Sequence, residues 1–250
     1  MAETKQVIVQ VKRQAGPKEQ PRWEEFALRW RPSMNIIICL RDIAENPVTR
    51  DGTKTTPVSY DSNCLEEVCG SCAMLINGKA RMACSALVDQ LEQPIRIEPF
   101  SKFPVVRDLA VDRSFMFESL KRVKAWIPID GTYDLGEGPR MAADVQEKAY
   151  PLSRCISCGS CLEVCPQVNE NSKFMGAAIM SQVRLFNMHP TGAMHAKERI
   201  NAVMGPGGIQ DCSNAQNCVK ACPKDIPLTE SLAEVNRDAW KQALLGWLVG

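Results

Sequence analysis

Four closely spaced cysteines followed by a proline are the feature of this sequence that most restricts its fold. The cysteines are separated by steps of three, three and four residues, in the order Cys155, Cys158, Cys161 and Cys165, and Pro166 follows the last. This spacing, C-x2-C-x2-C-x3-C-P, is typical of chains that hold two iron–sulfur clusters, and its fourth cysteine binds the second cluster. The run therefore predicts two clusters and a matching run elsewhere in the chain.

The matching run begins 47 residues after Cys165, and alanine fills one of its cysteine positions. Ala215 stands at the second position, while the rest of the frame is kept by Cys212, Cys218, Cys222 and Pro223. The two runs form an internal repeat of the kind found in two-cluster bacterial ferredoxins, here with a long helical insertion between them.

Exchange of the fourth cysteines between the two runs predicts the ligands of both clusters. One set has four thiolates and predicts a [4Fe–4S] cluster held by Cys155, Cys158, Cys161 and Cys222. Alanine has no donor atom, so we expect a [3Fe–4S] cluster at the other set, Cys165, Cys212 and Cys218. A [4Fe–4S] cluster with water or Ser213 as its fourth ligand is the alternative.

A third group of cysteines lies in the N-terminal half of the chain and has a different spacing. Its members follow the C-x4-C-x2-C…C pattern of plant-type [2Fe–2S] ferredoxins, and they are Cys64, Cys69, Cys72 and Cys84. Gly70 and Ser71 are expected to bring backbone close to the cluster and to offer N–H donors. Asn77-Gly78 predicts a tight turn that returns the chain toward the loop. A zinc knuckle or two disulfides is the alternative for this group.

The composition favours metal-bound thiolates over disulfides. The chain has 250 residues, 12 cysteines and only two histidines, a set of soft ligands that suits iron–sulfur clusters or zinc. The seven thiolates of the two runs fit no pair of four-ligand zinc sites. The N-terminus is polar and lacks the apolar stretch that begins a secreted disulfide protein. A net charge of +1, without a basic stripe rich in aromatic residues, argues against nucleic acid as a partner.

Apolar periodicity predicts a β-rich domain over residues 1–110 and a helical domain over residues 111–250. Strands are expected at 6–12, 23–30, 74–77, 80–84 and 95–99, and a helix is expected at 35–46. The second domain should contain a loop at 127–140 and helices at 113–126, 141–149, 174–187, 196–204 and 229–248. No apolar stretch approaches the roughly 18 residues of a membrane span. We expect the short apolar segment at 243–250 to cap the core, and packing on a partner is the alternative.

A [2Fe–2S] domain followed by a [4Fe–4S]/[3Fe–4S] domain closely resembles the iron–sulfur subunit of succinate dehydrogenase and fumarate reductase. The resemblance covers nearly the whole chain, and all eleven ligand cysteines of that family fall on cysteines here. The stretches 103–108 and 181–186 also look like the family's. The resemblance implies an α+β fold, in which a plant-type ferredoxin domain of the β-grasp type precedes an α-helical domain like a two-cluster bacterial ferredoxin.

The resemblance also implies a role and partners for the chain. It implies a flavoprotein subunit with FAD and the dicarboxylate site, and a membrane anchor with haem b and quinone. This chain would pass single electrons between them from the cytoplasmic face of the membrane, with no side chain acting as acid or base. A free ferredoxin-like carrier is the rival function, but such carriers are usually small and acidic, whereas this chain is long and near neutral.

Departures from the ubiquinone-linked branch of that family favour a menaquinone-linked member with a single di-haem anchor chain. Ubiquinone-linked members carry aromatic residues, including tryptophan, shortly after the Cys-Pro, and a histidine directly after the first cysteine of the second run. Here Gln167 follows Pro166 and Ser213 follows Cys212, so only Pro166 is carried over to the vicinity of the quinone. The loop at 65–67 also lacks the arginine of many members. The residues alone leave open whether succinate oxidation or fumarate reduction is the physiological direction.

Overall fold

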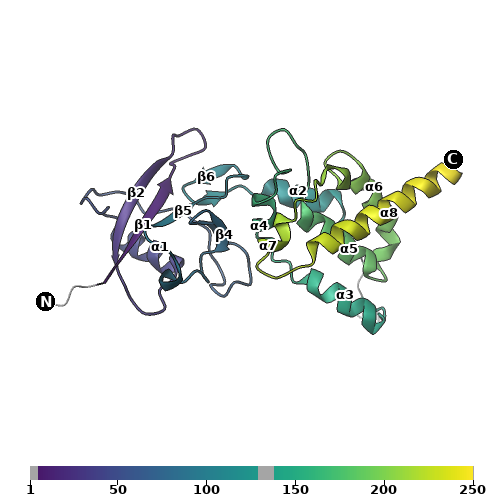
Figure 1. Cartoon of the computed structure of the whole chain (residues 1–250), viewed down its shortest axis with the longest axis horizontal. Helices are drawn as coiled ribbons and strands as arrows, with labels where there is room; N and C mark the ends of the chain where they lie inside the picture. Colours follow the sequence, from purple (N-terminus) through teal and green to yellow (C-terminus); the bar gives the residue numbers. More distant parts are fainter. Residues whose placement is uncertain (1–4, 129–137, 250) are drawn as a thin grey trace. The chain divides into compact units, whose positions relative to one another are not determined.

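The computed structural model describes residues 5–128 and 138–249, and its contacts divide the chain into two compact units. The first unit comprises Met1–Arg113 and Ile156–Glu163, and the second comprises Ser114–Cys155 and Val164–Gly250. Part of the first cysteine run therefore packs with the N-terminal unit. The elements of both units are labelled in Figure 1.

A five-stranded sheet in the order β2-β1-β5-β3-β4 forms the frame of the first unit. Its strands are β1 (Gln6–Arg13), β2 (Arg22–Arg29), β3 (Ala73–Ile76), β4 (Lys79–Met82) and β5 (Ile95–Glu98). β1 runs parallel to β5, while the β1–β2, β3–β4 and β3–β5 pairs are antiparallel. Val7, Val9 and Val11 on one face of β1 are fully buried, so the alternating pattern sets which face of this strand is in the core.

Helix α1 (Ile36–Glu45) packs against β2 of this sheet (Figure 1). Its start is fixed locally, because Oδ1 of Asn35 accepts a hydrogen bond from the N–H of Ile38 at 2.9 Å. The β3–β4 turn is fixed by its two residues, Asn77-Gly78, which both have positive φ (48° and 74°). That conformation suits a two-residue hairpin, and it returns β4 toward the cysteine loop that precedes β3.

A buried ion pair ties the stretch after the sheet to strand β1. The side chains of Arg13 and Asp108 are each 2% exposed, and Nε and Nη2 of the arginine donate to the two carboxylate oxygens at 3.0 and 3.2 Å. Asp108 also accepts hydrogen bonds from the N–H groups of Gln14 and Ser59. Burial alone raises the pKa of Asp108, but these hydrogen bonds outweigh it, and the pKa lies below its ordinary value.

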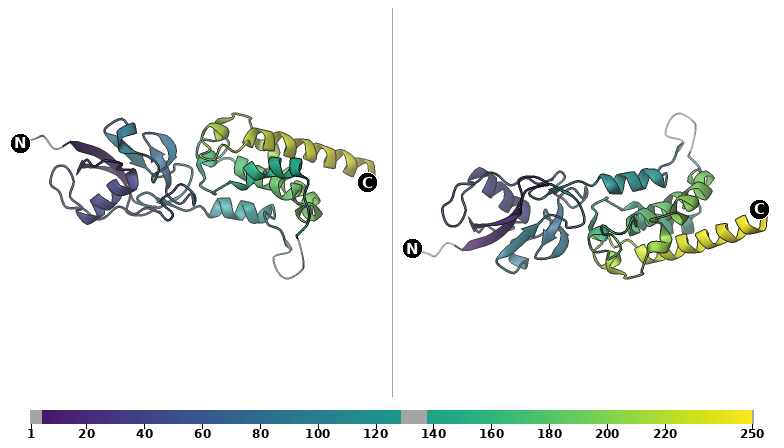
Figure 2. Two further views of the ribbon diagram at one scale, coloured as in Figure 1. Left: turned by 90° about the horizontal axis from the view of Figure 1, so that it is seen from below. Right: turned by 90° about the horizontal axis from the view of Figure 1, so that it is seen from above.

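The second unit is helical and is organised around α5 (Ala177–Met188). This helix runs beside α8 (Leu228–Val249), as Figures 1 and 2 show, and it also contacts α2 (Ser114–Arg122), α3 (Ala143–Ser153) and α6 (Ala196–Met204). The inward-facing stripe of α8 is formed by Leu232, Val235 and Ala239, which recur at helical spacing and are buried.

Shorter elements complete the two units. Two one-turn helices, α4 (Ser160–Glu163) and α7 (Asn217–Lys220), lie within the cysteine runs. Two short strands, β6 (Val105–Arg107) and β7 (Ala110–Val111), flank Asp108. The 3-10 turns are η1 (Val88–Gln90), η2 (Gly192–His195) and η3 (Ile209–Asp211).

The predicted elements are present, with differences at a few places. α3 continues through Pro151 to Ser153, whose hydroxyl donates to the carbonyl oxygen of Tyr150 at 2.8 Å, so the predicted end at residue 149 is wrong. Leu244 and Leu245 are 57% and 61% exposed, so the apolar C-terminal segment does not cap the core at these positions. β6 and β7 have no counterpart among the predicted strands, because two or three residues are too short to show a period.

The predicted loop at 127–140 falls largely on residues 129–137, which lie outside the described residues. Among the helices that the structure describes, none is both long enough and apolar enough to cross a membrane.

Candidate iron–sulfur cluster sites

The four cysteines with plant-type spacing lie together around the loop that precedes β3. The backbone N–H groups of Glu66, Val68 and Cys69 donate to Sγ of Cys64 at 3.3–3.4 Å. The N–H of Glu67 donates to Sγ of Cys84 at 3.3 Å, and that of Cys64 donates to Sγ of Cys69 at 3.5 Å. Cys72 lies close enough to Cys84 to raise the pKa of that thiol. The structure thus brings Cys64, Cys69, Cys72 and Cys84 to one place.

Alternating left-handed residues explain why this loop presents so many N–H donors to sulfur. Leu65 and Glu67 have φ values of 63° and 56°, and such alternation turns successive N–H groups toward the same side of the backbone. Donors of this kind stabilise negative charge on sulfur, so the loop fits an anionic, thiolate-ligated cluster. Ser71 forms hydrogen bonds with Cys69, as expected from the sequence. Gly70 instead lets the loop lie against the backbone of Ile156 and Cys158.

The surroundings of these thiols move their pKa values in opposite directions. Hydrogen bonds from the N–H of Cys64 and from Ser71 lower the pKa of Cys69 to about 6. Burial raises the pKa of Cys84 to about 11, and the neighbouring Cys72 adds to the rise. Because iron binds the thiolate form, loading of the site displaces the proton that Cys84 holds at neutral pH.

The first cysteine run is divided between the two units. Cys158 and Cys161 belong to the first unit, whereas Cys155 belongs to the second, which also contains Cys222. Within the first unit, Gly159 has a φ of 85°, and a Cβ added to it would lie 2.9 Å from the ring of Phe103. Glycine is therefore favoured at this point of the run, both for its backbone conformation and for the space it leaves beside the Phe103 ring.

Glu163 anchors the end of this run, and the sequence analysis missed it. Its buried carboxylate accepts hydrogen bonds from the N–H and the hydroxyl of Ser101, at 3.0 and 2.6 Å, and from the N–H of Lys102, at 3.0 Å. These partners lie 62 and 61 positions away in the sequence, so no local pattern reveals the contact. The contact fixes α4 to the segment that follows β5.

The three cysteines assigned to the second cluster of the repeat line one cavity in the helical unit. Cys165, Cys212 and Cys218 all face this cavity, and Ala215 and Pro166 line it as well. Burial raises the pKa of Cys218, and the charges of Cys165 and Cys212 act in the same direction. Three thiols and the alanine at the predicted vacancy therefore share a single site.

The remaining cysteine is buried in a helix, and each of the two histidines has a contact with a residue three positions further along the chain. Cys39 is fully buried in α1, where burial raises its pKa to about 12. Nδ1 of His189 accepts a hydrogen bond from the N–H of Gly192, and Nδ1 of His195 lies 3.2 Å from Oε1 of Glu198. In residues 5–128 and 138–249, no group of three or more His, Cys, Asp or Glu side chains could hold a single metal ion.

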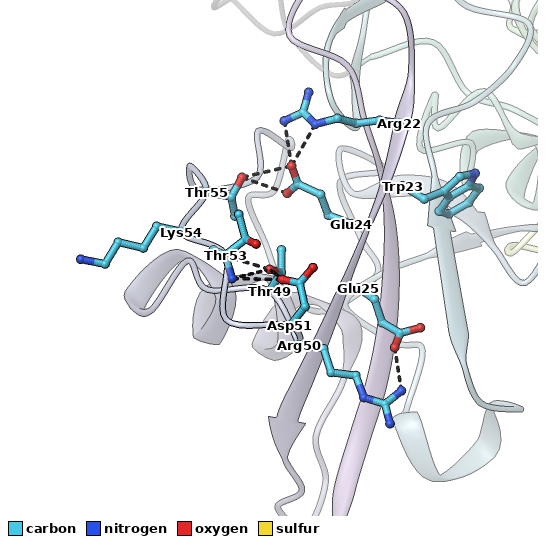
Figure 3. Close-up of a pocket in the computed structure, with 10 residues that line it drawn as sticks. All are labelled: Arg22, Trp23, Glu24, Glu25, Thr49, Arg50, Asp51, Thr53, Lys54 and Thr55. Carbon is cyan, nitrogen blue, oxygen red and sulfur yellow. Dashed lines mark hydrogen bonds and ion pairs between the residues drawn. The ribbon is translucent and has the colours of Figure 1, made fainter.

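A surface pocket beside β2 has no cysteine in its lining, and its charged side chains are largely engaged with one another (Figure 3). Arg22 pairs with Glu24, which also accepts from the Thr55 hydroxyl, and Arg50 pairs with Glu25. Lys54 points away from these groups in Figure 3. These ion pairs and hydrogen bonds hold the loop after α1 to β2. The lining contains no cysteine that could bind a cluster.

Comparisons with known proteins agree with this geometry. Residues 8–118 match the family described as "2Fe-2S iron-sulfur cluster binding domain", and residues 151–226 match "4Fe-4S dicluster domain". The chain is 60% identical over 243 residues to the succinate dehydrogenase iron-sulfur subunit of Bacillus subtilis, covering 97% of this chain and 96% of the relative. It is 29% identical over 221 residues to the fumarate reductase iron-sulfur subunit of Wolinella succinogenes, covering 87% and 90%.

The fold is also found in a solved structure. A chain of the Mycobacterium smegmatis Sdh1 complex in the apo form superposes with a TM-score of 0.79, covering 96% of this chain and 98% of that chain. The sequence identity is 23%, so this likeness is one of fold.

Fold and sites together define an iron–sulfur electron-transfer protein with an N-terminal [2Fe–2S] domain and a C-terminal [4Fe–4S] dicluster domain, and the predicted fold class is confirmed. The identity over nearly the full length then assigns the family. The chain belongs to the iron–sulfur subunits of succinate dehydrogenase and fumarate reductase, as the resemblance indicated. Its role is electron transfer in an oxidoreductase complex, and neither a free carrier nor a zinc- or disulfide-stapled structural protein is favoured.

Proposed function

We propose that eleven cysteines hold three clusters, with the ligand sets that the spacing predicts, in domains spanning residues 1–110 and 111–250. The [2Fe–2S] cluster is held by Cys64, Cys69, Cys72 and Cys84. The [4Fe–4S] cluster is held by Cys155, Cys158, Cys161 and Cys222, and the [3Fe–4S] cluster by Cys165, Cys212 and Cys218. The observation that carries the proposal is the set of backbone N–H groups at 66–69 that donate to the sulfur atoms of Cys64 and Cys84.

Clusters of these types accept and release one electron at a time, and this is the chemistry that they would supply here. The chain's own residues set the conditions for it. Cysteine thiolates ligate the irons, and the N–H groups of the loop at 64–69 stabilise negative charge on their sulfur atoms. The burial of Cys72, Cys158 and Cys218 keeps water from these sulfur atoms, which opposes the more negative, reduced form.

Replacement of one ligand cysteine should remove one cluster and leave the others. We expect Cys72→Ala to abolish the electron paramagnetic resonance signal of the reduced [2Fe–2S] cluster while the signals of the other two clusters persist. Cys39→Ala is the matched control, because Cys39 is equally buried in the same unit and is not a ligand in this assignment. A [2Fe–2S] signal that survives in Cys72→Ala, or that disappears in Cys39→Ala, contradicts the ligand assignment.

A flavoprotein subunit with FAD is proposed as the electron donor or acceptor at the [2Fe–2S] end. The loop that carries Cys64 and Cys69 also carries Leu65 and Val68, whose side chains are 39% and 60% exposed. Large apolar side chains at the rim of a redox site favour contact with another protein surface. This supports a partner that docks over the loop and brings its own redox group close to the cluster.

A membrane anchor with haem b and quinone is proposed at the other end, with the chain on the cytoplasmic face of the membrane. Pro166 lines the same cavity as the [3Fe–4S] cysteines, which supports its place in the vicinity of the quinone. Trp240, Leu244 and Leu245 of α8 are exposed, which supports a protein partner for this helix. The departures at Gln167 and Ser213 favour menaquinone and a single di-haem anchor chain.

Purification of the membrane complex through this chain tests the proposed partners together. We expect the preparation to contain a flavoprotein with FAD, an anchor with haem b, and menaquinone in its organic extract. Finding ubiquinone alone would contradict the proposed quinone.

The higher identity to a succinate dehydrogenase subunit than to a fumarate reductase subunit, 60% against 29%, favours succinate oxidation as the faster direction in this preparation. A faster rate of fumarate reduction would overturn that direction.

A further inference from the structure

Two cysteine loops meet within the first unit, and Gly70 allows them to do so. This glycine lies between Cys69 and Cys72 and has a φ of 74°. A Cβ added to it would lie 2.4 Å from the carbonyl oxygen of Ile156 and 3.0 Å from Cα and Cβ of Cys158. The loop of the [2Fe–2S] ligands therefore touches the backbone of the [4Fe–4S] run directly, with no side chain between them.

The guanidinium of Arg113 holds the [2Fe–2S] side of this junction. Its Nη1 donates to the carbonyl oxygen of Gly70 at 2.9 Å. Its Nη2 donates to the carbonyl oxygens of Ser71 and Ala73 at 3.0 and 3.4 Å. No carboxylate forms an ion pair with this guanidinium among the pairs that the structure describes, so its positive charge is not locally cancelled by direct contact.

The third nitrogen of the guanidinium, unlike the other two, has no hydrogen-bond partner among the described residues. Nε of Arg113 is buried and has no hydrogen-bond acceptor in the described part of the chain. A buried N–H without an acceptor is unfavourable, so we expect this N–H to face the negative charge of a cluster when the site is loaded. The thiolates that act electrostatically on Arg113 are Cys158, Cys72 and Cys69, which come from both ligand sets.

We propose that Arg113 is a redox-tuning residue that raises the reduction potentials of both the [2Fe–2S] and the [4Fe–4S] cluster at their junction. The inference rests on the ligand assignment proposed above. Reduction adds a negative charge to a cluster, and a nearby cation favours that form. Screening by salt is weak for a charge whose surroundings are largely buried. One arginine would thus set two neighbouring steps of the electron path together, instead of each cluster being tuned alone.

The test is a redox titration of the purified complex, followed by electron paramagnetic resonance of each cluster. In Arg113→Gln, which removes the charge, we expect both couples to shift downward by about tenfold in their reduced-to-oxidised ratio, or about 59 mV for a one-electron couple. Arg113→Lys keeps the charge but lacks the fork of donors, and both potentials should stay near those of the wild type. Arg107→Gln is the matched control, because Arg107 is an exposed arginine of the same unit.

The outcomes separate this inference from the ligand assignment. Absence of [2Fe–2S] and [4Fe–4S] signals in the wild type would refute the assignment itself. Intact signals in Arg113→Gln with potentials equal to those of Arg107→Gln would overturn the tuning role. Equal shifts in Arg113→Gln and Arg113→Lys would also overturn it, because the hydrogen bonds and not the charge would then be responsible.

A second variant decides the matter if Arg113→Gln loses a cluster. Asp61 is the carboxylate that acts most strongly on the charge of Arg113. Asp61→Asn leaves the hydrogen bonds of Arg113 in place and removes this opposing charge, so both potentials should rise. Potentials that stay at their wild-type values in Asp61→Asn would then refute the proposal.

Discussion

Replacement of Ala215 by cysteine is expected to convert the three-iron cluster into a [4Fe–4S] cluster. Ala215 lines the cavity shared by Cys165, Cys212 and Cys218, at the position where the frame of the first run has its second cysteine. A thiolate at this corner supplies the ligand that a fourth iron lacks. The expected result is loss of the signal of the oxidised [3Fe–4S] cluster and the appearance of a second reduced [4Fe–4S] signal.

The local backbone favours this substitution. Ala215 is exposed, and its neighbours Asn214 and Gln216 have φ values of 56° and 60°, so the alanine sits at the turning point of a tight loop. A larger side chain at an exposed position causes no overpacking. The cysteine should therefore reach the cavity without a change in the rest of the fold.

Ser213→Cys is the matched control for Ala215→Cys. Ser213 lines the same cavity two residues earlier, but it is outside the cysteine frame. We expect Ser213→Cys to keep the signal of the oxidised three-iron cluster at its wild-type intensity. If the wild type itself holds a [4Fe–4S] cluster at this site, and Ser213→Ala changes that cluster, then Ser213 is a ligand and the vacancy at Ala215 is refuted.

The ligand sets remain predictions, but the cysteines that the structure brings together could be predicted largely from short spacings along the chain. A ligand loop is a local structure, so steps of three, four or five residues carry its geometry. The same holds for the cap at Asn35 and the turn at Asn77-Gly78, which depend on one or two residues. The sequence predicts that α3 ends before Pro151, because proline disfavours a continuing helix, whereas the helix runs on to Ser153 with Leu152 buried beyond the proline.

The residues that the sequence did not reveal all act over long separations. Arg113 holds Gly70 from 43 positions away, Glu163 holds Ser101 from 62, and Asp108 pairs with Arg13 from 95. Each is a single charged residue without a motif, and its meaning appears only when the fold brings the partners together. In the stretch 103–108, which resembles that of the family, the buried carboxylate of Asp108 holds the chain to β1 through Arg13.

Asp108→Asn should cause the largest loss of stability in the first unit. The substitution removes the charge that Arg13 faces, and it leaves a buried guanidinium with fewer acceptors. Breaking a buried ion pair by changing one partner costs about 3–5 kcal/mol. Because Arg13 keeps a second contact with Glu24 at 2.6 Å, we expect a loss near the lower end, about 3 kcal/mol. Asparagine tolerates the positive φ of this position, 47°, so the effect should report the charge and not the backbone.

The measurement is a denaturation with guanidinium chloride of the full chain with its clusters. The midpoint is the denaturant concentration at which half of the visible absorbance of the [2Fe–2S] site is lost. Asp89→Asn is the control, because it breaks an exposed pair with Lys5 whose loss costs about 0–1 kcal/mol. The pKa of Asp108 is lowered in the folded chain, so its contribution is present above its unfolded pKa of about 3.9 and is lost as the pH falls further. Asp108→Asn should therefore have a lower unfolding midpoint than the wild type at neutral pH. As the pH falls below about 4, the midpoint of the variant should decrease less than that of the wild type. Equal midpoints for Asp108→Asn and Asp89→Asn at neutral pH would show that the buried pair does not hold this stretch to β1.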